Sequence, residues 1–177
     1  MLPEVTYYVG ASLDGFLARE DGSVDWLDCV EDGDEDYGYA EFFATVDGLL
    51  MGRATYDFAR AHEPWVYGDT PCWVWSHREL GDAPPAVSVT TQAPRELLAE
   101  LGARGLRHLW LVGGGQLAGA FAREGLISSL VISVVPVVLG KGIPLLGDEG
   151  LPGTLALQSS QSYRSGLVRL VYATARS

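Results

Sequence analysis

Cysteine, positive charge and long hydrophobic runs are all scarce in this 177-residue chain. The two cysteines, Cys29 and Cys72, are too few for the disulfide framework of a small secreted protein, so we expect reduced thiols. No apolar run approaches the roughly 18 residues that a membrane-spanning helix needs. The first residues also lack the basic start of a signal peptide. These absences predict a cytoplasmic protein with no membrane segment.

Basic residues are outnumbered by acidic ones. The chain has 12 lysines and arginines against 23 aspartates and glutamates, and its net charge is -11. Because nucleic-acid phosphates are neutralised by a basic face, this balance argues against nucleic-acid binding. If the chain binds an anionic ligand, it must do so with a few well-placed arginines.

The length suits one domain spanning residues 1–177, which would bury roughly 70% of the surface of the unfolded chain. Segments rich in β-branched and aromatic residues predict strands. Apolar residues at helical spacing predict the helices between them. The expected strands are 5–11, 49–51, 72–75, 87–89, 108–112 and 129–138, and the expected helices are 39–46, 56–61, 94–101 and 117–124.

The last part of the chain carries strand patterns alone. Residues 155–157 and 167–173 predict a terminal antiparallel hairpin. Since strands and helices alternate before it, we expect an α/β fold whose sheet is mostly parallel with an antiparallel edge.

Three polar or glycine-rich turns follow predicted strands. In open α/β sheets, ligands bind beyond the carboxyl ends of the strands. The first turn is the triple glycine 113–115, which opens a helix and leaves backbone N–H groups free to bind phosphate. It comes late in the chain and lacks the G-x-G-x-x-G spacing, which disfavours the standard dinucleotide-binding domain. A tight turn without a ligand is the alternative.

Arginines mark the other two turns. Arg53 follows the strand 49–51, and a guanidinium binds phosphate through a planar fork. Ser76, His77 and Arg78 follow the strand 72–75, and together they suit a phosphomonoester. No acidic residue stands at that strand end to bind a ribose diol, so the pattern favours NADPH over NADH. A solvated surface arginine is the alternative interpretation for Arg53.

These turns resemble motifs of the dihydrofolate-reductase family. Residues 51–56, Met-Gly-Arg-Ala-Thr-Tyr, are similar to the family's M-G-R-x-T-[WY] motif, and residues 112–115 resemble its late glycine turn. Residues 12–18 and 136–146 resemble two signatures of the reductase domain of the bifunctional riboflavin-biosynthesis deaminase/reductase. The resemblance covers nearly the whole chain and implies a stand-alone reductase domain, because the deaminase half is absent.

The resemblance also implies a three-layer fold, a mixed sheet with helices on both faces, and NADPH lying across the strand ends. Arg53, Ala54 and Thr55 would meet the adenosine phosphates, Ser76 to Arg78 the 2′-phosphate, and Gly114 to Gln116 the pyrophosphate. Gly10 and Leu17 would border the nicotinamide. The full implied cofactor set is Gly10, Leu17, Gly52, Arg53, Ala54, Thr55, Ser76, His77, Arg78, Val112, Gly113, Gly114, Gly115, Gln116 and Leu117.

Substrate-side residues are less well defined. Trp26 would match the tryptophan of the family's active-site loop. The first interpretation of Phe42 is a side chain of the hydrophobic core, and the second is a wall of the substrate pocket. Asp36 corresponds to the family's proton-relay acid if no gap intervenes, but Asp34 or Glu35 is the choice if the alignment slips, and a helix-starting role is the alternative. Asp14 is a second candidate acid, although its turn position alone explains it.

The pattern therefore predicts hydride transfer from NADPH to a small pteridine- or pyrimidine-like heterocycle. One alternative is reduction of a ribosylaminopyrimidine phosphate, which would need a second basic patch to which Lys141 and Arg164 could contribute. Another is a module that binds NADPH without turnover. The apolar run 129–138 and the exposed hairpin edge also suggest a homodimer.

Overall fold

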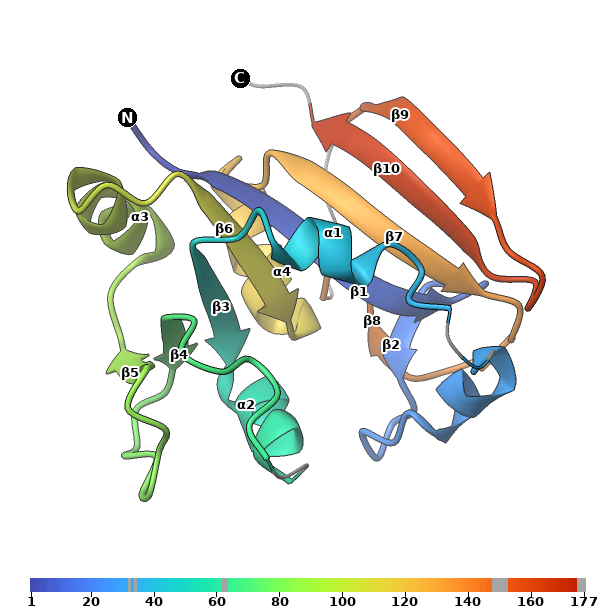
Figure 1. Cartoon of the computed structure of the whole chain (residues 1–177), viewed down its shortest axis with the longest axis horizontal. Helices are drawn as coiled ribbons and strands as arrows, with labels where there is room; N and C mark the ends of the chain where they lie inside the picture. Colours follow the sequence, from blue (N-terminus) through green and yellow to red (C-terminus); the bar gives the residue numbers. More distant parts are fainter. Residues whose placement is uncertain (32, 34, 62–63, 148–152, 175–177) are drawn as a thin grey trace.

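A central eight-stranded sheet organises the chain in a computed structural model (Figure 1). The structure describes residues 1–31, 33, 35–61, 64–147 and 153–174. The strand order is β5-β4-β3-β6-β1-β7-β10-β9. The sheet strands are β1 (Glu4–Ser12), β3 (Gly48–Gly52), β4 (Cys72–Trp75), β5 (Val87–Thr90), β6 (His108–Gly113), β7 (Ser129–Val135), β9 (Leu155–Ser162) and β10 (Val168–Thr174).

Neighbouring strands from β5 to β7 are parallel, and the last two are antiparallel. The expected terminal hairpin is therefore confirmed, with β10 pairing both β7 and β9. Because β3, β4 and β6 are parallel, their carboxyl ends lie at one rim. The arrowheads of β3 and β6 point toward this rim, where α2 (Arg53–Arg60) begins (Figure 1).

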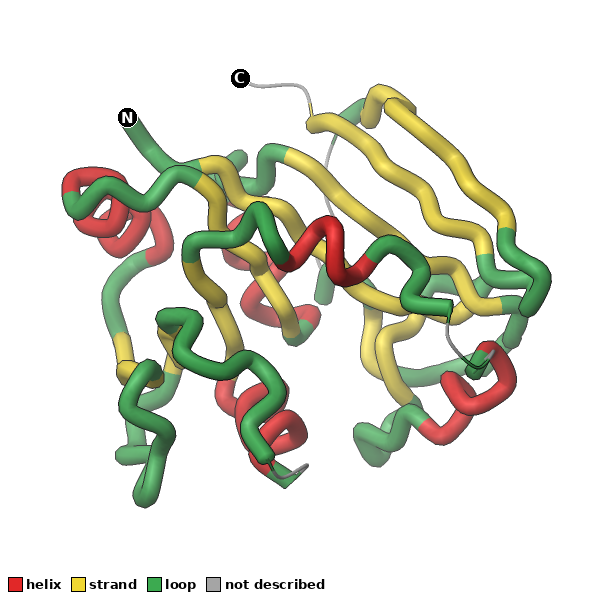
Figure 2. Tube along the Cα trace, in the orientation of Figure 1, coloured by secondary structure: helices red, strands yellow, loops and turns green. Residues whose placement is uncertain are grey.

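Helices cover both faces of the sheet, as expected (Figure 2). Buried residues of α3 (Pro94–Ala103) and α4 (Gly115–Arg123), such as Leu101 and Phe121, pack on one face with Tyr7. On the other face, α1 (Tyr39–Phe43) and α2 (Arg53–Arg60) contribute Phe42 and Tyr56 to a cluster with Trp110. No helix of the described residues is both long and apolar enough to cross a membrane.

Three predicted boundaries were wrong. Helix α2 begins at Arg53 instead of Tyr56, because Gly52 is still extended and passes directly into the helix. Helix α1 ends at Phe43, and Gly48 belongs to β3 instead of ending a helix. The run 129–138 leaves the sheet at Val135, because Pro136 has no N–H group for a ladder hydrogen bond.

Two smaller elements were not predicted. Residues 25–30 form the 3-10 helix η1 (Asp25–Val30), and a two-stranded antiparallel sheet joins β2 (Phe16–Ala18) to β8 (Ile143–Pro144). This small sheet brings the turn after β1 to the segment after β7. Both segments carry the motifs that resemble the riboflavin enzyme.

The two thiols are expected to react very differently. Cys72 is completely buried in β4, and this burial raises the pKa of its thiol to about 12, whereas Cys29 is exposed. Because the thiolate is the reactive form, a water-soluble thiol reagent at pH 8 should modify one cysteine in the native protein and two in denaturant. Mass spectrometry of the modified protein checks this, and rapid modification of Cys72 in native protein would contradict the buried position of β4.

Candidate active site

The ends of β3, β4 and β6 lie next to one another at the rim. Gly52 at the end of β3 pairs with Trp75 of β4, and Met51 pairs with Gly113 of β6. Each of the three strands is followed by one of the turns singled out in the sequence. The structure therefore brings Arg53, Ser76 and the triple glycine together.

The triple glycine lies against the first turn of α2. A Cβ atom built on Gly114 would lie 3.4 Å from the Thr55 hydroxyl, and one built on Gly52 would lie 3.5 Å from the Gly114 nitrogen. Gly113 has a φ of 145°, a conformation that side chains rarely adopt, and the Gly113–Gly114 peptide bond is cis. Bare backbone thus packs against the first turn of α2, where a side chain on Gly113 or Gly114 would contact Thr55.

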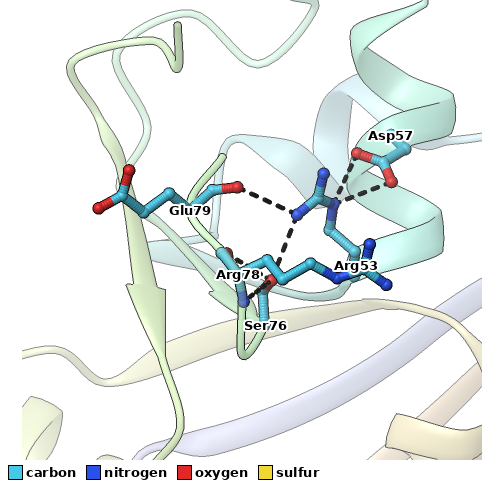
Figure 3. Close-up of polar contacts among 5 residues, drawn as sticks. All are labelled: Arg53, Asp57, Ser76, Arg78 and Glu79. Carbon is cyan, nitrogen blue, oxygen red and sulfur yellow. Dashed lines mark hydrogen bonds and ion pairs between the residues drawn. The ribbon is translucent and has the colours of Figure 1, made fainter. Parts of the chain in front are cut away.

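A hydrogen-bond network around Ser76 connects the two arginine turns (Figure 3). The Arg53 side chain donates from Nη1 to the Ser76 hydroxyl (3.3 Å) and to the Glu79 carbonyl (3.3 Å), and its Nε contacts the Asp57 carboxylate at 2.8 Å. The Ser76 hydroxyl donates to the Arg78 carbonyl (2.7 Å) and accepts from the Arg78 N–H (3.1 Å). Ser76 therefore organises this loop.

His77 and Arg78 remain exposed at the tip of the same loop. In Figure 3 the Arg78 side chain extends from the loop after β4 toward α2, the helix that carries Arg53. Two guanidinium groups and the N–H groups at the start of α4 thus gather in an otherwise acidic protein. Such a set can bind a doubly phosphorylated anion.

The segment after β7 packs against the triple glycine at Gly115. A Cβ built on Gly115 would lie 2.3 Å from the Pro144 carbonyl oxygen, so only glycine fits there without a shift of backbone. The Tyr7 hydroxyl donates to the Leu145 carbonyl at 2.6 Å, which fastens this segment to β1. Sequence reasoning identified the 136–146 motif. It did not identify the close approach of Gly115 to Pro144, because these residues are far apart in the sequence.

The predicted nicotinamide side lies along β1. A Cβ on Gly10 would meet Leu27 of η1 at 3.5 Å, so η1 packs close to this strand. Leu17 is half-buried in β2. Trp26 is buried with Val135 and Leu167, and its indole Nε1 has no hydrogen-bond partner among the described residues. Contact between Trp26 and the substrate stays a prediction.

Asp14 fastens two loops together. Its Oδ1 accepts hydrogen bonds from the Ser12 hydroxyl (2.7 Å) and the Leu139 N–H (3.1 Å), and its Oδ2 accepts one from the Gly140 N–H (2.7 Å). These bonds, the Ser12 contact first, lower the pKa of the carboxyl group. An acid held ionised in this way is a poor proton donor near neutral pH, and the geometry favours a structural role.

The lowered pKa of Asp14 has a consequence for stability. A carboxyl group whose pKa is lower in the folded state stabilises the protein above its unfolded pKa of about 3.9, and this contribution is lost as the pH falls through the folded pKa. We expect Asp14→Asn to lower the urea midpoint at pH 6, and to lower it less at pH 3. An equal loss at both pH values would contradict a contribution from the ionised carboxylate.

Asp36 and Phe42 lie on the α1 side of the sheet. Both carboxylate oxygens of Asp36 accept backbone N–H groups, from Gly38 (2.9 Å) and Ala40 (3.0 Å), and these bonds lower its pKa. The side chain therefore caps α1, and its proton-relay role stays a prediction. The Phe42 ring is buried against Tyr8 and Trp110, with ring centroids 4.7 and 5.5 Å away, so it is a core side chain. Of the two alternative acids, Asp34 lies outside the described residues, and the Glu35 carboxylate accepts a hydrogen bond from the Tyr37 N–H (3.2 Å).

Comparison with known proteins identifies the family. The family model for the RibD C-terminal domain matches residues 3–169 of this chain. The uncharacterised protein YwjB of Bacillus subtilis is 36% identical over 157 residues, covering 88% of this chain and 90% of its own length. The riboflavin biosynthesis protein RibD of Corynebacterium ammoniagenes is 31% identical over 162 residues, covering 81% of this chain. The chain spans only 46% of that RibD protein.

Solved structures agree with this assignment. A Shewanella sp. PV-4 protein, itself only provisionally assigned to riboflavin biosynthesis, is 30% identical with a TM-score of 0.87, covering 99% of this chain and all of the other. The deaminase/5-amino-6-(5-phosphoribosylamino)uracil reductase of Thermotoga maritima, at 14% identity and a TM-score of 0.73, covers 98% of this chain and 57% of the other, and shares the fold. The resemblance inferred from the sequence is thereby confirmed: the chain belongs to the RibD C-terminal domain family and has its dihydrofolate-reductase-like α/β fold.

Proposed function

We propose that the chain is a cytoplasmic, NADPH-dependent reductase of a small pteridine- or pyrimidine-like heterocycle. The observation that carries the proposal is the meeting of Arg53, the Ser76–Arg78 loop and the triple glycine at one rim. This rim offers two guanidinium groups, free N–H groups at the start of α4 and glycines without side chains. Such a set fits a dinucleotide that carries an extra phosphate. The Thermotoga maritima protein of the same fold is named a 5-amino-6-(5-phosphoribosylamino)uracil reductase, and this supports a reductase.

Each part of the rim has a separate task. Arg53 and the start of α2 would bind the adenosine phosphates, and the exposed His77 and Arg78 would bind the 2′-phosphate. The backbone of residues 114–116 would hold the pyrophosphate, so that the nicotinamide lies beside Gly10 and Leu17. NADPH supplies a hydride when it is bound, and the protein contributes its orientation.

The source of the proton follows from the two carboxylates. Asp14 and Asp36 have lowered pKa values and are bound to backbone N–H groups. Neither is a ready acid in this structure, so we infer that a water molecule near the substrate delivers the proton. Asp36 would take part only after releasing its bonds to the α1 backbone.

Turnover separates this proposal from a module that only binds the cofactor. Steady-state oxidation of NADPH should be measured against pteridines, pyrimidines and quinones, with a ribosylaminopyrimidine phosphate included for the riboflavin-type reaction. Oxidation with one of these classes supports the reductase. Cofactor binding without oxidation by any of them would favour the binding module.

Arg78 should set the preference for NADPH. We expect Arg78→Ala to weaken NADPH binding by about tenfold or more, because a charge-assisted hydrogen bond to the 2′-phosphate contributes roughly 1.5–3 kcal/mol. NADH lacks that phosphate, so its affinity should hardly change. Titrations of both cofactors check this, and equal weakening of the two would assign Arg78 a purely structural role.

The free edge of β9 is consistent with a homodimer, which we include in the proposal. All eight residues of β9 are exposed, and within the described part of the chain the strand pairs with β10 alone. By contrast, the apolar run 129–135 is an interior strand between β1 and β10, so burial within the sheet already explains it. A monomer by light scattering at micromolar concentration would end the dimer proposal.

A further inference from the structure

A strap of chain, residues 137–147, connects the two sides of the proposed cofactor site. It begins just after β7 and includes β8, which pairs with β2. The Leu13 N–H donates to the Val137 carbonyl at 2.8 Å, so the strap starts beside the turn that follows β1. At the other end, residues 144–147 lie against α4. The strap therefore contacts both the turn that leads into β2 and the turn that opens α4.

The Asp14 carboxylate holds the strap near its start. Its two oxygens accept hydrogen bonds from the Leu139 N–H (3.1 Å) and the Gly140 N–H (2.7 Å). The Ser12 hydroxyl donates to Asp14 and accepts from the Phe16 N–H, so the turn in its own right holds the carboxylate in place. Hydrogen bonds to a charged acceptor are roughly twice as strong as neutral ones. Asp14 thus fixes where the strap leaves this turn.

Farther along, the strap packs closely on β2. A Cβ atom built on Gly142 would lie 2.2 Å from the Ala18 carbonyl oxygen, so backbone lies directly on backbone there. The Leu145 N–H then donates to the Gly15 carbonyl at 3.0 Å. Because these contacts leave little room for independent movement, a displacement of the strap near Asp14 would also displace its end beside α4.

The end of the strap packs on a face of α4 that carries no side chains. Gly115 and Gly119 stand about one helical turn apart, so they share that face. A Cβ on Gly119 would lie 2.9 Å from the Leu146 carbonyl oxygen, and one on Gly115 would lie 2.3 Å from the Pro144 carbonyl oxygen. Since α4 begins at Gly115, the strap fixes this helix start relative to β2.

We propose that Asp14 is a positioning residue that keeps the nicotinamide side and the pyrophosphate side of the cofactor site at a fixed separation. This rests on the proposed function, which puts the nicotinamide beside Gly10 and Leu17 and the pyrophosphate at residues 114–116. The carboxylate acts through the strap and touches neither part of the cofactor. Two linked groups bind together only where the geometry lets both reach their sites at once, so a displaced strap loses the contribution of the second group.

Two ligands that share one half test this role. Adenosine 2′,5′-bisphosphate carries the part proposed for Arg53 and Arg78, whereas NADP⁺ adds the second phosphate of the pyrophosphate and the nicotinamide riboside. Their dissociation constants are measured by isothermal titration for the wild type and Asp14→Asn. We expect NADP⁺ to bind the variant roughly two- to tenfold more weakly, the effect of one lost hydrogen bond, and the bisphosphate to bind both proteins equally. A general loss of folding would weaken both ligands alike.

Matched variants locate the effect on the strap. Glu20→Gln removes the ion pair between Glu20 and Lys141 of the strap (2.6 Å), but both side chains are exposed, so both dissociation constants should stay unchanged. Gly142→Ala forces the strap away from β2 and should weaken NADP⁺ selectively, as Asp14→Asn does. The inference is overturned if Asp14→Asn binds NADP⁺ like the wild type, if it weakens both ligands by the same factor, or if Glu20→Gln has the same effect.

Hydrogen exchange of the wild-type protein is a second test that needs no variant. Because coupling between two sites is reciprocal, a cofactor whose affinity depends on the strap should in turn protect the strap amides. At saturation, NADP⁺ should slow exchange in residues 137–147 more than adenosine 2′,5′-bisphosphate does, and equal protection by the two ligands would contradict the inference. A wild type that binds neither ligand would remove the proposed function. Normal NADP⁺ binding by Asp14→Asn would remove only the role of Asp14.

Discussion

Replacing Gly115 by alanine is expected to lower both the stability of the fold and the affinity for NADPH. The new Cβ would lie 2.3 Å from the Pro144 carbonyl oxygen and 3.2 Å from the Gly147 nitrogen, and both are backbone atoms. Either α4 or the segment 144–147 must move. Forced overpacking of this kind costs about 1–3 kcal/mol. For a domain of this size, that lowers the melting temperature by roughly 2–4 °C per kcal/mol.

The loss of NADPH affinity follows from the same displacement, because the N–H groups at the start of α4 would turn away from the pyrophosphate. Thermal unfolding and cofactor titration of the one variant measure the two effects. Gln116→Ala, at the exposed next position, is the matched control for stability and should stay within about 0.5 kcal/mol of wild type. A Gly115→Ala protein as stable as wild type would contradict the close approach of the Pro144 carbonyl to Gly115.

Replacing Arg53 by alanine should weaken NADPH binding strongly with little loss of stability. The guanidinium bridges α2 to the loop after β4, and it would contribute one or two charge-assisted bonds to the adenosine phosphates. Losing such bonds costs about 1.5–3 kcal/mol, or roughly 10- to 150-fold in affinity. The Arg53 side chain is 39% exposed, and its ion pair with Asp57 contributes at most about 1 kcal/mol to stability.

Asp57→Asn is the matched control for Arg53. It removes the charge that competes for the same guanidinium, so NADPH should bind as tightly as before or more tightly. Isothermal titration of both variants checks the pair. If Arg53→Ala binds NADPH normally, or if it unfolds as readily as a core variant, Arg53 is a structural residue and the proposed phosphate site is wrong.

Local patterns sufficed for much of the fold. The sequence predicts the strand at residues 72–75 and the terminal hairpin because short apolar runs there are bounded by polar or glycine-containing turns. The three ligand turns were also located from sequence, since each follows a buried strand. Their meeting at one rim follows from the parallel sheet, because adjacent parallel strands end on the same side.

Features set by distant contacts could not be predicted. Helix α2 begins at Arg53 although no side chain caps it, because an extended Gly52 connects it directly to β3. The need for glycine at 115 arises from Pro144, and the close packing at Gly142 arises from Ala18. Sequence patterns also indicate Asp36 and Asp14 as candidate acids, whereas their hydrogen bonds to backbone N–H groups are visible only in the structure.

A crystal structure of the protein with NADP⁺ tests the central claim most directly. We predict the 2′-phosphate within hydrogen-bond distance of Arg78, an adenosine phosphate at Arg53, and the pyrophosphate against the backbone of residues 114–116. The nicotinamide should lie beside Gly10. A cofactor bound at another edge of the sheet, or one that leaves Arg53 and Arg78 in solvent, would contradict the account.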